Sequence, residues 1–142
     1  MSEQNKTVFR RIVEEVFNQG KLATADELGT EYMEHSPAPG QAPGIDGFKQ
    51  MVQMFRGAFP DLRITIEDLI AEGDRVVGRM TTSGTHRGEF MGLAPTGKRF
   101  TISEIHILRF ANGKILEHWG VADDLGMMQQ LGAVPVGALS QA

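Results

Sequence analysis

The stretch EIHILRFANGKILEHWGVADD, residues 104–124, decides how the C-terminal half of this chain folds. At its centre stands Asn112-Gly113, the dipeptide preferred in two-residue type I′ turns, and sequences rich in β-branched and aromatic residues flank it on both sides. The stretch therefore predicts a β-hairpin whose two strands run outward from this turn.

The register set by this turn places four distinctive side chains together. Counting outward from Asn112-Gly113, His106 lies opposite Trp119, and Glu104 and Asp123 follow on the same side. Because side chains alternate between the faces of a strand, we expect these four residues on one face of the hairpin. The other face is expected to carry the remaining side chains: Ile105, Ile107, Leu116, His118 and Ala122.

Both faces of this hairpin are partly apolar, and an apolar face of a sheet needs cover. Helices can cover one face, and a second subunit can cover the other. We therefore expect a homodimer or homotetramer built on Ile105, Ile107 and Leu116.

The chain before this hairpin begins with helices and continues as strands. Apolar residues at helical spacing predict a first helix that stops at Gly20 and a third from Phe48 to Phe59. We expect Asp46 to cap the third helix and Thr24 to cap a short second helix. Extended segments are predicted over residues 31–37, 61–72, 75–85, 98–110 and 114–123. Helices first and an antiparallel meander last predict an α+β fold with a curved sheet wrapped around the N-terminal helices.

A second turn, Glu72-Gly73-Asp74-Arg75, fixes another hairpin. Its register pairs Glu72 with Arg75 and Asp68 with Arg79, and opposite charges in both pairs support it. The connection at residues 88–98, GEFMGLAPTGK, lacks phosphate-loop spacing, and we expect it to act as a lid.

Bulk composition excludes several functions. The chain has 142 residues and is expected to form one domain over 1–142, with a tail that frays from about residue 134. A net charge of −4 argues against nucleic-acid or anionic-membrane partners, and no apolar run approaches the ~18 residues of a membrane span. With no cysteine and no signal peptide, a cytoplasmic location fits. The four histidines lack metal-ligand spacing, so no metal site is expected.

These residues resemble the SnoaL-like polyketide cyclase (ester cyclase) family. The resemblance rests on GKILEHW followed by Asp123 and LGMMQQLG, on His106 in EIHILRF, and on THRGEFMGLAPTGKRF. It spans about Tyr32 to Gly132. The family belongs to the cone-shaped, cystatin-like α+β barrels that include nuclear transport factor 2, ketosteroid isomerase and limonene epoxide hydrolase, and this fold is expected here.

The resemblance implies a cofactor-independent intramolecular aldol cyclisation of an apolar carbonyl compound. It implies Asp123 as the general acid/base, helped by His106. The alternatives are that Asp123 or Asp124 caps the following helix, and that His106 is a core histidine. In the predicted register the Cα atoms of His106 and Asp123 lie roughly 13 Å apart, so a substrate between them would have to link the two.

Five further residues are candidates for substrate binding. Trp119 is expected as an aromatic pocket wall, and His35 is expected at the mouth of the cone. Glu104 adds a second carboxylate, Phe55 can shape the cavity from the third helix, and Tyr32 can reach it. Each also has an ordinary structural interpretation, as a core or solvated side chain.

Other functions remain open from the sequence, namely isomerase, dehydratase or epoxide hydrolase chemistry, or binding without turnover. An isomerase of this fold would use a tyrosine as oxyanion donor, and Tyr32 is the sole tyrosine. An epoxide hydrolase would need an Asp-Arg-Asp set, for which Asp68, Arg79 and Asp123 are candidates. The third possibility is a binding domain that keeps the pocket without turnover.

Overall fold

The structure, a computed structural model, describes residues 2–135, so most of the tail expected to fray lies outside the described residues. Its elements in chain order are α1 (Ser2–Arg11), the π-helix η1 (Ile12–Asn18), the 3₁₀-helix η2 (Leu22–Glu27), β1 (Leu28–Glu34), α2 (Gly44–Ala58), β2 (Arg63–Glu72), β3 (Arg75–Thr85), β4 (Arg99–Ala111), β5 (Lys114–Ala122) and α3 (Asp124–Gln130).

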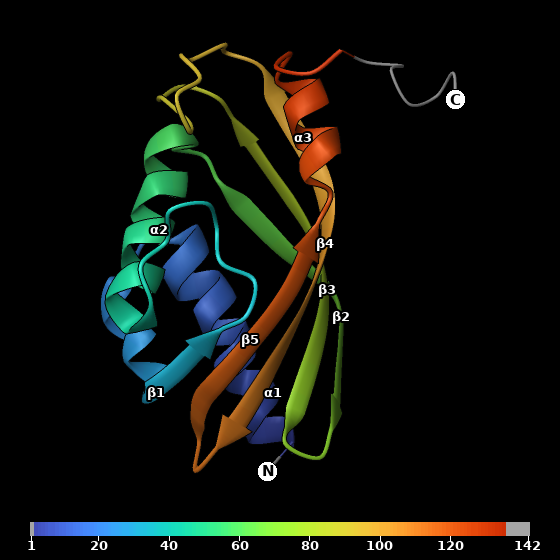
Figure 1. The fold of residues 1–142 in the computed structure, drawn as a ribbon. Coiled ribbons are helices and arrows are strands. Elements are labelled where there is room, and N and C mark those ends of the chain that lie inside the picture. The colour runs from blue at the N-terminus through green and yellow to red at the C-terminus, as the bar shows by residue number, and fades with distance from the viewer. Residues whose placement is uncertain (1, 136–142) are drawn as a thin grey trace.

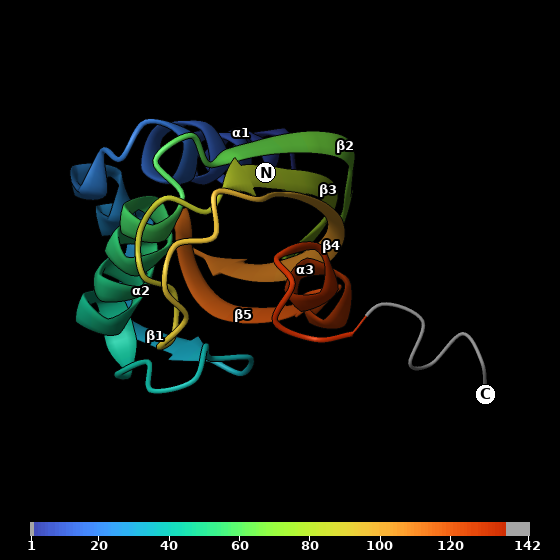
Figure 2. The same cartoon turned by 90° about the horizontal axis from the view of Figure 1, so that it is seen from above.

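One five-stranded sheet, in the order β1-β5-β4-β3-β2, forms one wall of the molecule. Strands β2 to β5 form the predicted antiparallel meander, and β1 joins its edge parallel to β5. The sheet curves around α1 and α2, which cover its concave face, while α3 lies at one end (Figure 1). Seen from above, the strands form an open arc that the helices close (Figure 2). The predicted α+β fold with a curved sheet is confirmed.

Two helices begin at other N-cap residues than the sequence predicted. Thr24 lies inside η2, whose N-cap is Lys21, and its hydroxyl donates to Glu15 at 2.8 Å instead. Asp46 lies in the first turn of α2, whose N-cap is Pro43. Both cap predictions are wrong, although a carboxylate in the first turn still interacts favourably with the helix dipole.

The β4–β5 hairpin contains a bulge that the sequence did not reveal. The predicted turn is present and Phe110 pairs with Ile115, but the next pair is Arg109 with Glu117, which leaves Leu116 as an extra residue. Leu116 instead lies next to Gly29 of β1. A slip of one residue moves every later side chain to the opposite face of the strand.

Beyond this bulge the predicted pairs are wrong by one position. His106 pairs with Gly120, and Trp119 pairs with Ile107. Trp119 therefore lies on the convex face of the sheet, while His118, expected on that face, joins His106 on the concave face.

The β2–β3 hairpin has the predicted register. Glu72 pairs with Arg75 and Asp68 with Arg79, whose side chains form an ion pair at 2.6 Å. More than half of each of these two side chains is exposed on the convex face.

Two apolar clusters join the helices to the sheet. The larger joins α1, η1 and α2 to the sheet around Phe9, Val16 and Val52, and the smaller surrounds Phe59 and Phe100 near α3. Within residues 2–135, no helix is long and apolar enough to span a membrane.

Candidate active site

A cavity of about 470 Å³ lies between the helices and the concave face of the sheet. Its size falls within the range typical of small-molecule sites, roughly 300–1,000 Å³. Most of its wall is apolar and includes Phe17, Phe48, Met51, Phe55, Phe90 and Met128. An organic molecule with several rings fits such a cavity by size and polarity.

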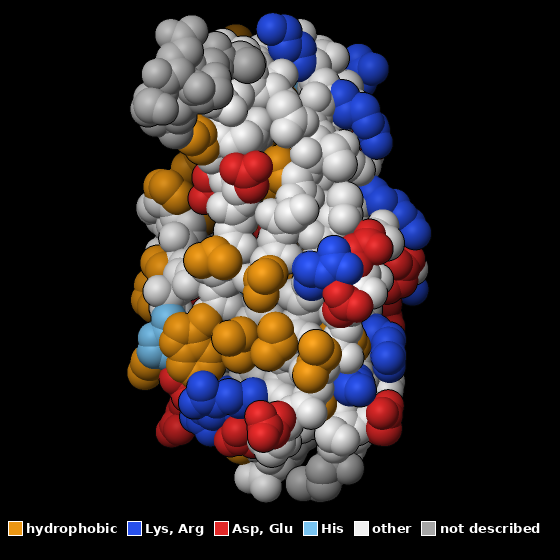
Figure 3. Space-filling view, turned by 90° about the vertical axis from the view of Figure 1, so that its right-hand side faces the viewer, with side chains coloured by type: hydrophobic (Ala, Val, Ile, Leu, Met, Phe, Trp, Pro, Cys, Tyr) orange, Lys and Arg blue, Asp and Glu red, His pale blue; other side chains and the backbone are white. Residues whose placement is uncertain are grey.

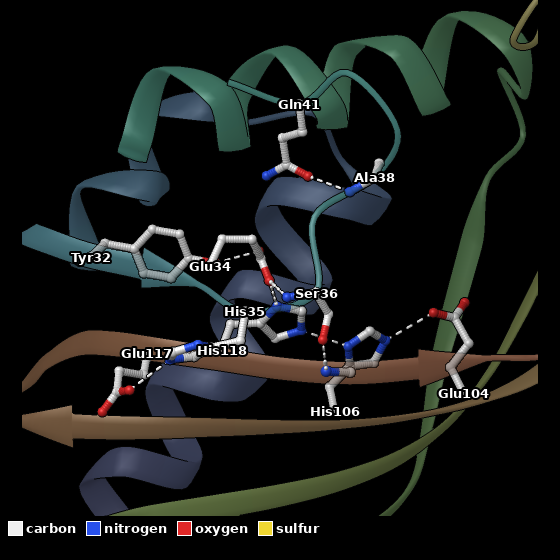
Figure 4. A network of polar contacts seen from close by, with 11 residues as sticks. Tyr32, Glu34, His35, Ser36, Ala38, Gln41, Glu104, His106, Glu117 and His118 are labelled. Carbon is white, nitrogen blue, oxygen red and sulfur yellow. Dashed lines mark hydrogen bonds and ion pairs between the residues drawn. The ribbon is translucent and has the colours of Figure 1, made fainter. Parts of the chain in front are cut away.

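A continuous chain of polar side chains crosses one wall of this cavity (Figure 4). The Tyr32 hydroxyl donates to Glu34 at 2.7 Å, and the other oxygen of Glu34 contacts Nδ1 of His118. Nε2 of His118 lies 2.7 Å from Nδ1 of His106, and Nε2 of His106 lies 2.8 Å from Glu104. Three strands, β1, β5 and β4, supply this chain.

Both carboxylates in the chain are held in the ionised form. Burial raises the pKa of Glu34, but the hydrogen bond and charge of His118 outweigh it, so the pKa lies below its usual value. Burial likewise raises the pKa of Glu104, but the hydrogen bond and charge of His106 outweigh this effect, so the pKa of Glu104 also lies below its usual value. At neutral pH both groups therefore act as acceptors only.

Gly120 is what allows the two imidazoles to meet. A Cβ atom at this position would lie 2.3 Å from Nδ1 of His106 and 2.9 Å from Nε2 of His118. The Gly120 amide donates to the Ser36 hydroxyl at 3.0 Å, which ties β5 to the loop after β1. Any larger residue at 120 would have to separate the rings.

The two acids at the end of β5 have different positions. Asp123 is exposed and caps α3, accepting a hydrogen bond from the Gly126 amide at 2.9 Å. Asp124 is also exposed but lines the cavity, and partial burial, reinforced by the charges of Glu104 and Asp123, raises its pKa. The expectation that Asp123 shares a face with His106 is thus wrong, because the bulge shifts the register. The catalytic role expected of Asp123 stays a prediction.

Trp119 and His35 lie outside the cavity, against expectation. Their rings stack at a centroid distance of 4.7 Å, and the Arg75 guanidinium lies 5.0 Å from the Trp119 ring. His35 also contacts Glu117 at 2.7 Å. The bulge that brings His118 inward turns Trp119 outward, so its expected position as a pocket wall is wrong.

Tyr32, Phe55 and Glu104 line the cavity, as expected. Burial and the neighbouring Glu34 raise the pKa of Tyr32, so its phenol stays protonated. Phe55 packs against Phe90 of the 88–98 connection at a centroid distance of 5.5 Å. That connection therefore covers part of the cavity, and its role as a moving lid stays a prediction.

Sequence reasoning missed several polar residues of the cavity, among them Glu34, His118 and Gln41. Glu34 follows Tyr32 by two positions, and this spacing on a strand was the signal that both share a face. His118 was hidden by the bulge. Gln41 accepts from the Ala38 amide at 2.9 Å, and its Nε2 has no partner among the described residues.

The Asp-Arg-Asp set of an epoxide hydrolase is not assembled in this cavity. Asp68 and Arg79 pair on the convex face, and Asp123 caps α3. In the described part of the chain, no group of three or more histidine or acidic side chains is arranged to hold a metal ion.

The known proteins that resemble this chain in sequence include cyclases of one family. A model of the SnoaL-like polyketide cyclase family matches residues 7–131. The aklanonic acid methyl ester cyclase AcmA of Streptomyces galilaeus is 36% identical over 137 residues, which are 93% of this chain and 92% of that protein. The nogalonic acid methyl ester cyclase of Streptomyces nogalater is 32% identical over 123 residues, 82% of this chain and 89% of that protein.

Solved structures show the same likeness. TsrD from Streptomyces laurentii is 31% identical with a TM-score of 0.86, covering 94% of this chain and 98% of that one. IdmH from Streptomyces antibioticus is 35% identical with a TM-score of 0.78, covering 91% of this chain and 99% of that one.

Proposed function

Because the chain belongs to the SnoaL-like polyketide cyclase family, we propose that it closes a ring in an apolar polyketide ester by an intramolecular aldol reaction. The observation that carries this proposal is the imidazole of His106, held between His118 and Glu104 on the wall of an apolar cavity of about 470 Å³. Such a wall supplies a proton donor where bulk water is scarce, which is what the closing step needs.

The reaction requires one base and one acid. Asp124 takes a proton from the carbon next to a carbonyl group, and the carbanion attacks a second carbonyl carbon of the same molecule. His106 donates a proton to the oxygen of that second carbonyl, which becomes a hydroxyl group. Partial burial and the charges of Glu104 and Asp123 raise the pKa of Asp124, which makes it a stronger base than an ordinary aspartate. The product is an isomer of the substrate, and no cofactor takes part.

The charge of the cavity favours an uncharged substrate. Three carboxylates, Glu34, Glu104 and Asp124, line it, and its described lining contains no lysine or arginine. A free carboxylate would meet three carboxylates in this cavity and no lysine or arginine, whereas an ester carries no charge to be repelled. The unpartnered Nε2 of Gln41 can donate to a carbonyl oxygen of the ester.

The experiment is an incubation of the purified protein with the methyl esters of aklanonic and nogalonic acid and with the two free acids. We expect conversion of at least one ester to a product of unchanged mass and altered retention, and slower conversion of the free acids. Stoichiometric binding of an ester without conversion would overturn the proposed catalysis and favour a binding domain. An isomer that lacks the new ring would indicate isomerase chemistry.

We further propose that a second copy of the chain covers the convex face. A row of apolar side chains crosses four strands there in register, namely Ile70, Val77, Ile107 and Trp119. Figure 3 shows a hydrophobic band on this face with charged side chains below it. The predicted contact residues Ile105 and Ile107 lie on this face, and the bulged Leu116 lies beside Gly29 of β1. The cytoplasmic location expected from the sequence stays a prediction.

A further inference from the structure

The histidine pair in the cavity has two rings where the proposed reaction uses one. His118 and His106 are in direct contact, and each outer nitrogen contacts a carboxylate, Glu34 on one side and Glu104 on the other. His118 and Glu34 have 16% and 6% of their side-chain surface exposed, so both are nearly withdrawn from water. Buried groups of this kind need their hydrogen bonds satisfied.

The number of protons on the pair follows from its contacts. An ionised carboxylate only accepts, so Nδ1 of His118 and Nε2 of His106 must each carry a hydrogen. The two inner nitrogens lie 2.7 Å apart, and this contact needs one hydrogen between them. Three protons on four nitrogens give the pair one positive charge in total.

We propose that His118 and Glu34 are positioning residues that make His106 part of a two-imidazole acid with one shared proton. This inference rests on the proposed function. When Nε2 of His106 gives its proton to the substrate oxygen, the shared proton stays on Nδ1 of His106. Both rings are then neutral, each with one proton, and the contact between them persists. Glu34 holds the hydrogen on Nδ1 of His118 and so fixes which nitrogen faces His106.

Gly120 provides independent support for this arrangement. The pair can form because position 120 has no side chain, since any Cβ there would overlap both rings. The three atoms nearest to such a Cβ all belong to these two imidazoles, so their contact explains why position 120 carries no side chain.

The groups that face the pair come from three elements. Tyr32 and Glu34 belong to β1, Glu104 to β4 and Asp124 to the first turn of α3. The described side chains that α1, η1 and α2 contribute to the cavity are apolar. Every charged group around the pair is therefore acidic, which favours its positive charge.

The first test is the pH dependence of turnover in Glu34→Gln. The amide can still accept from His118 but lacks the negative charge. The alkaline limb of the rate profile, where the acid loses its proton, should move to lower pH by about one unit or more. The matched control is Glu117→Gln, which removes a carboxylate bound to a histidine, His35, on the convex face and should not move the limb. An equal loss of rate at every pH in Glu34→Gln would indicate a merely structural role and overturn the proposal.

The second test needs no substrate. In a protein with ¹⁵N-labelled histidines, the ring nitrogens of His106 and His118 should show three protons at neutral pH, one of them shared. Gly120→Ala should abolish the shared signal while the signals of His86, whose Nδ1 accepts from the Thr96 amide, stay unchanged. Two independent neutral rings in the wild type would overturn the proposal. Because this readout is independent of turnover, a shared proton without conversion of any ester would contradict only the proposed function.

Discussion

The two faces of the β4–β5 hairpin carry alternating residues of the same two strands and have opposite chemistry. The concave face carries Glu104, His106 and His118 in a hydrogen-bonded chain within a cavity. The convex face carries Ile107 and Trp119 in an apolar row at the surface. One face has the groups for proton transfer, and the other has what an interface between subunits requires.

A single extra residue, the bulged Leu116, decides which side chains of β5 lie on which face. Without the bulge at Leu116, Trp119 would face the cavity and His118 would face outward, and no second imidazole would contact His106. The position of a bulge can therefore decide which side chains of a strand take part in chemistry.

The largest difference between the two faces is expected when the general acid, His106, is removed from the concave face. We expect His106→Ala to lower kcat by roughly 10²–10⁴-fold, the contribution typical of a positioned general acid. His35→Ala removes a histidine from the convex side and should leave kcat close to that of the wild type. Steady-state kinetics on the converted ester measures both. A comparable loss in His35→Ala would mean that the convex face takes part in the reaction.

Asp123 and Asp124, which follow β5, are neighbours in sequence and are expected to respond differently to substitution. Asp124→Asn should lower kcat by roughly 10²-fold or more, because an amide cannot accept the substrate proton. Asp123→Asn should retain turnover, because asparagine also accepts a hydrogen bond as an N-cap. If instead only Asp123→Asn is inactive, the base is Asp123, as the resemblance to the cyclase family implies, and α3 must move during the reaction.

Assembly is tested on the convex face. Ile107→Glu places a carboxylate in the middle of the apolar row, and burying it unpaired costs several kcal/mol, so the dissociation constant should rise by at least about 100-fold. Sedimentation equilibrium measures the change, and Glu67→Gln, an exposed β2 variant, serves as the control. A wild-type protein that is already monomeric at micromolar concentration would remove this face from any assembly.

The smallest expected effect concerns stability and pH. The pKa of Glu34 is lowered on folding, so its contribution is present above its ordinary value of about 4.3 and is lost as pH falls through the lower folded value. Glu34→Gln should therefore destabilise the protein by roughly 1–3 kcal/mol at pH 7, and less at acidic pH. Asp68→Asn, at an exposed ion pair, should have a smaller effect. Denaturant titrations at several pH values measure both, and a constant difference for Glu34→Gln would contradict the assignment of its charge.

Most of the fold was predictable because its signals are local. Asn112-Gly113 and Glu72-Gly73-Asp74-Arg75 formed the predicted turns, and the helical spacing of apolar residues located both long helices. Glu104 and His106 were correctly placed together because they lie on one strand, where alternation holds whatever the pairing.

The rest depended on pairing between strands. No local signal distinguishes Leu116 from its neighbours as the bulged residue, and the error passed to Trp119 and His118 beyond it. Glu34 joined the site because β1 adds to the sheet beside β5, a long-range contact that spacing along the chain does not encode. The choice between Asp123 and Asp124 as cap likewise depended on where β5 ends.

A crystal structure with an unreactive ester analogue tests the central claim most directly, namely that the concave face of this hairpin performs the chemistry. The account predicts the analogue inside the cavity, with a carbonyl oxygen about 3 Å from Nε2 of His106. An analogue bound elsewhere, with His106 still paired to Glu104 and the cavity unoccupied, would contradict it.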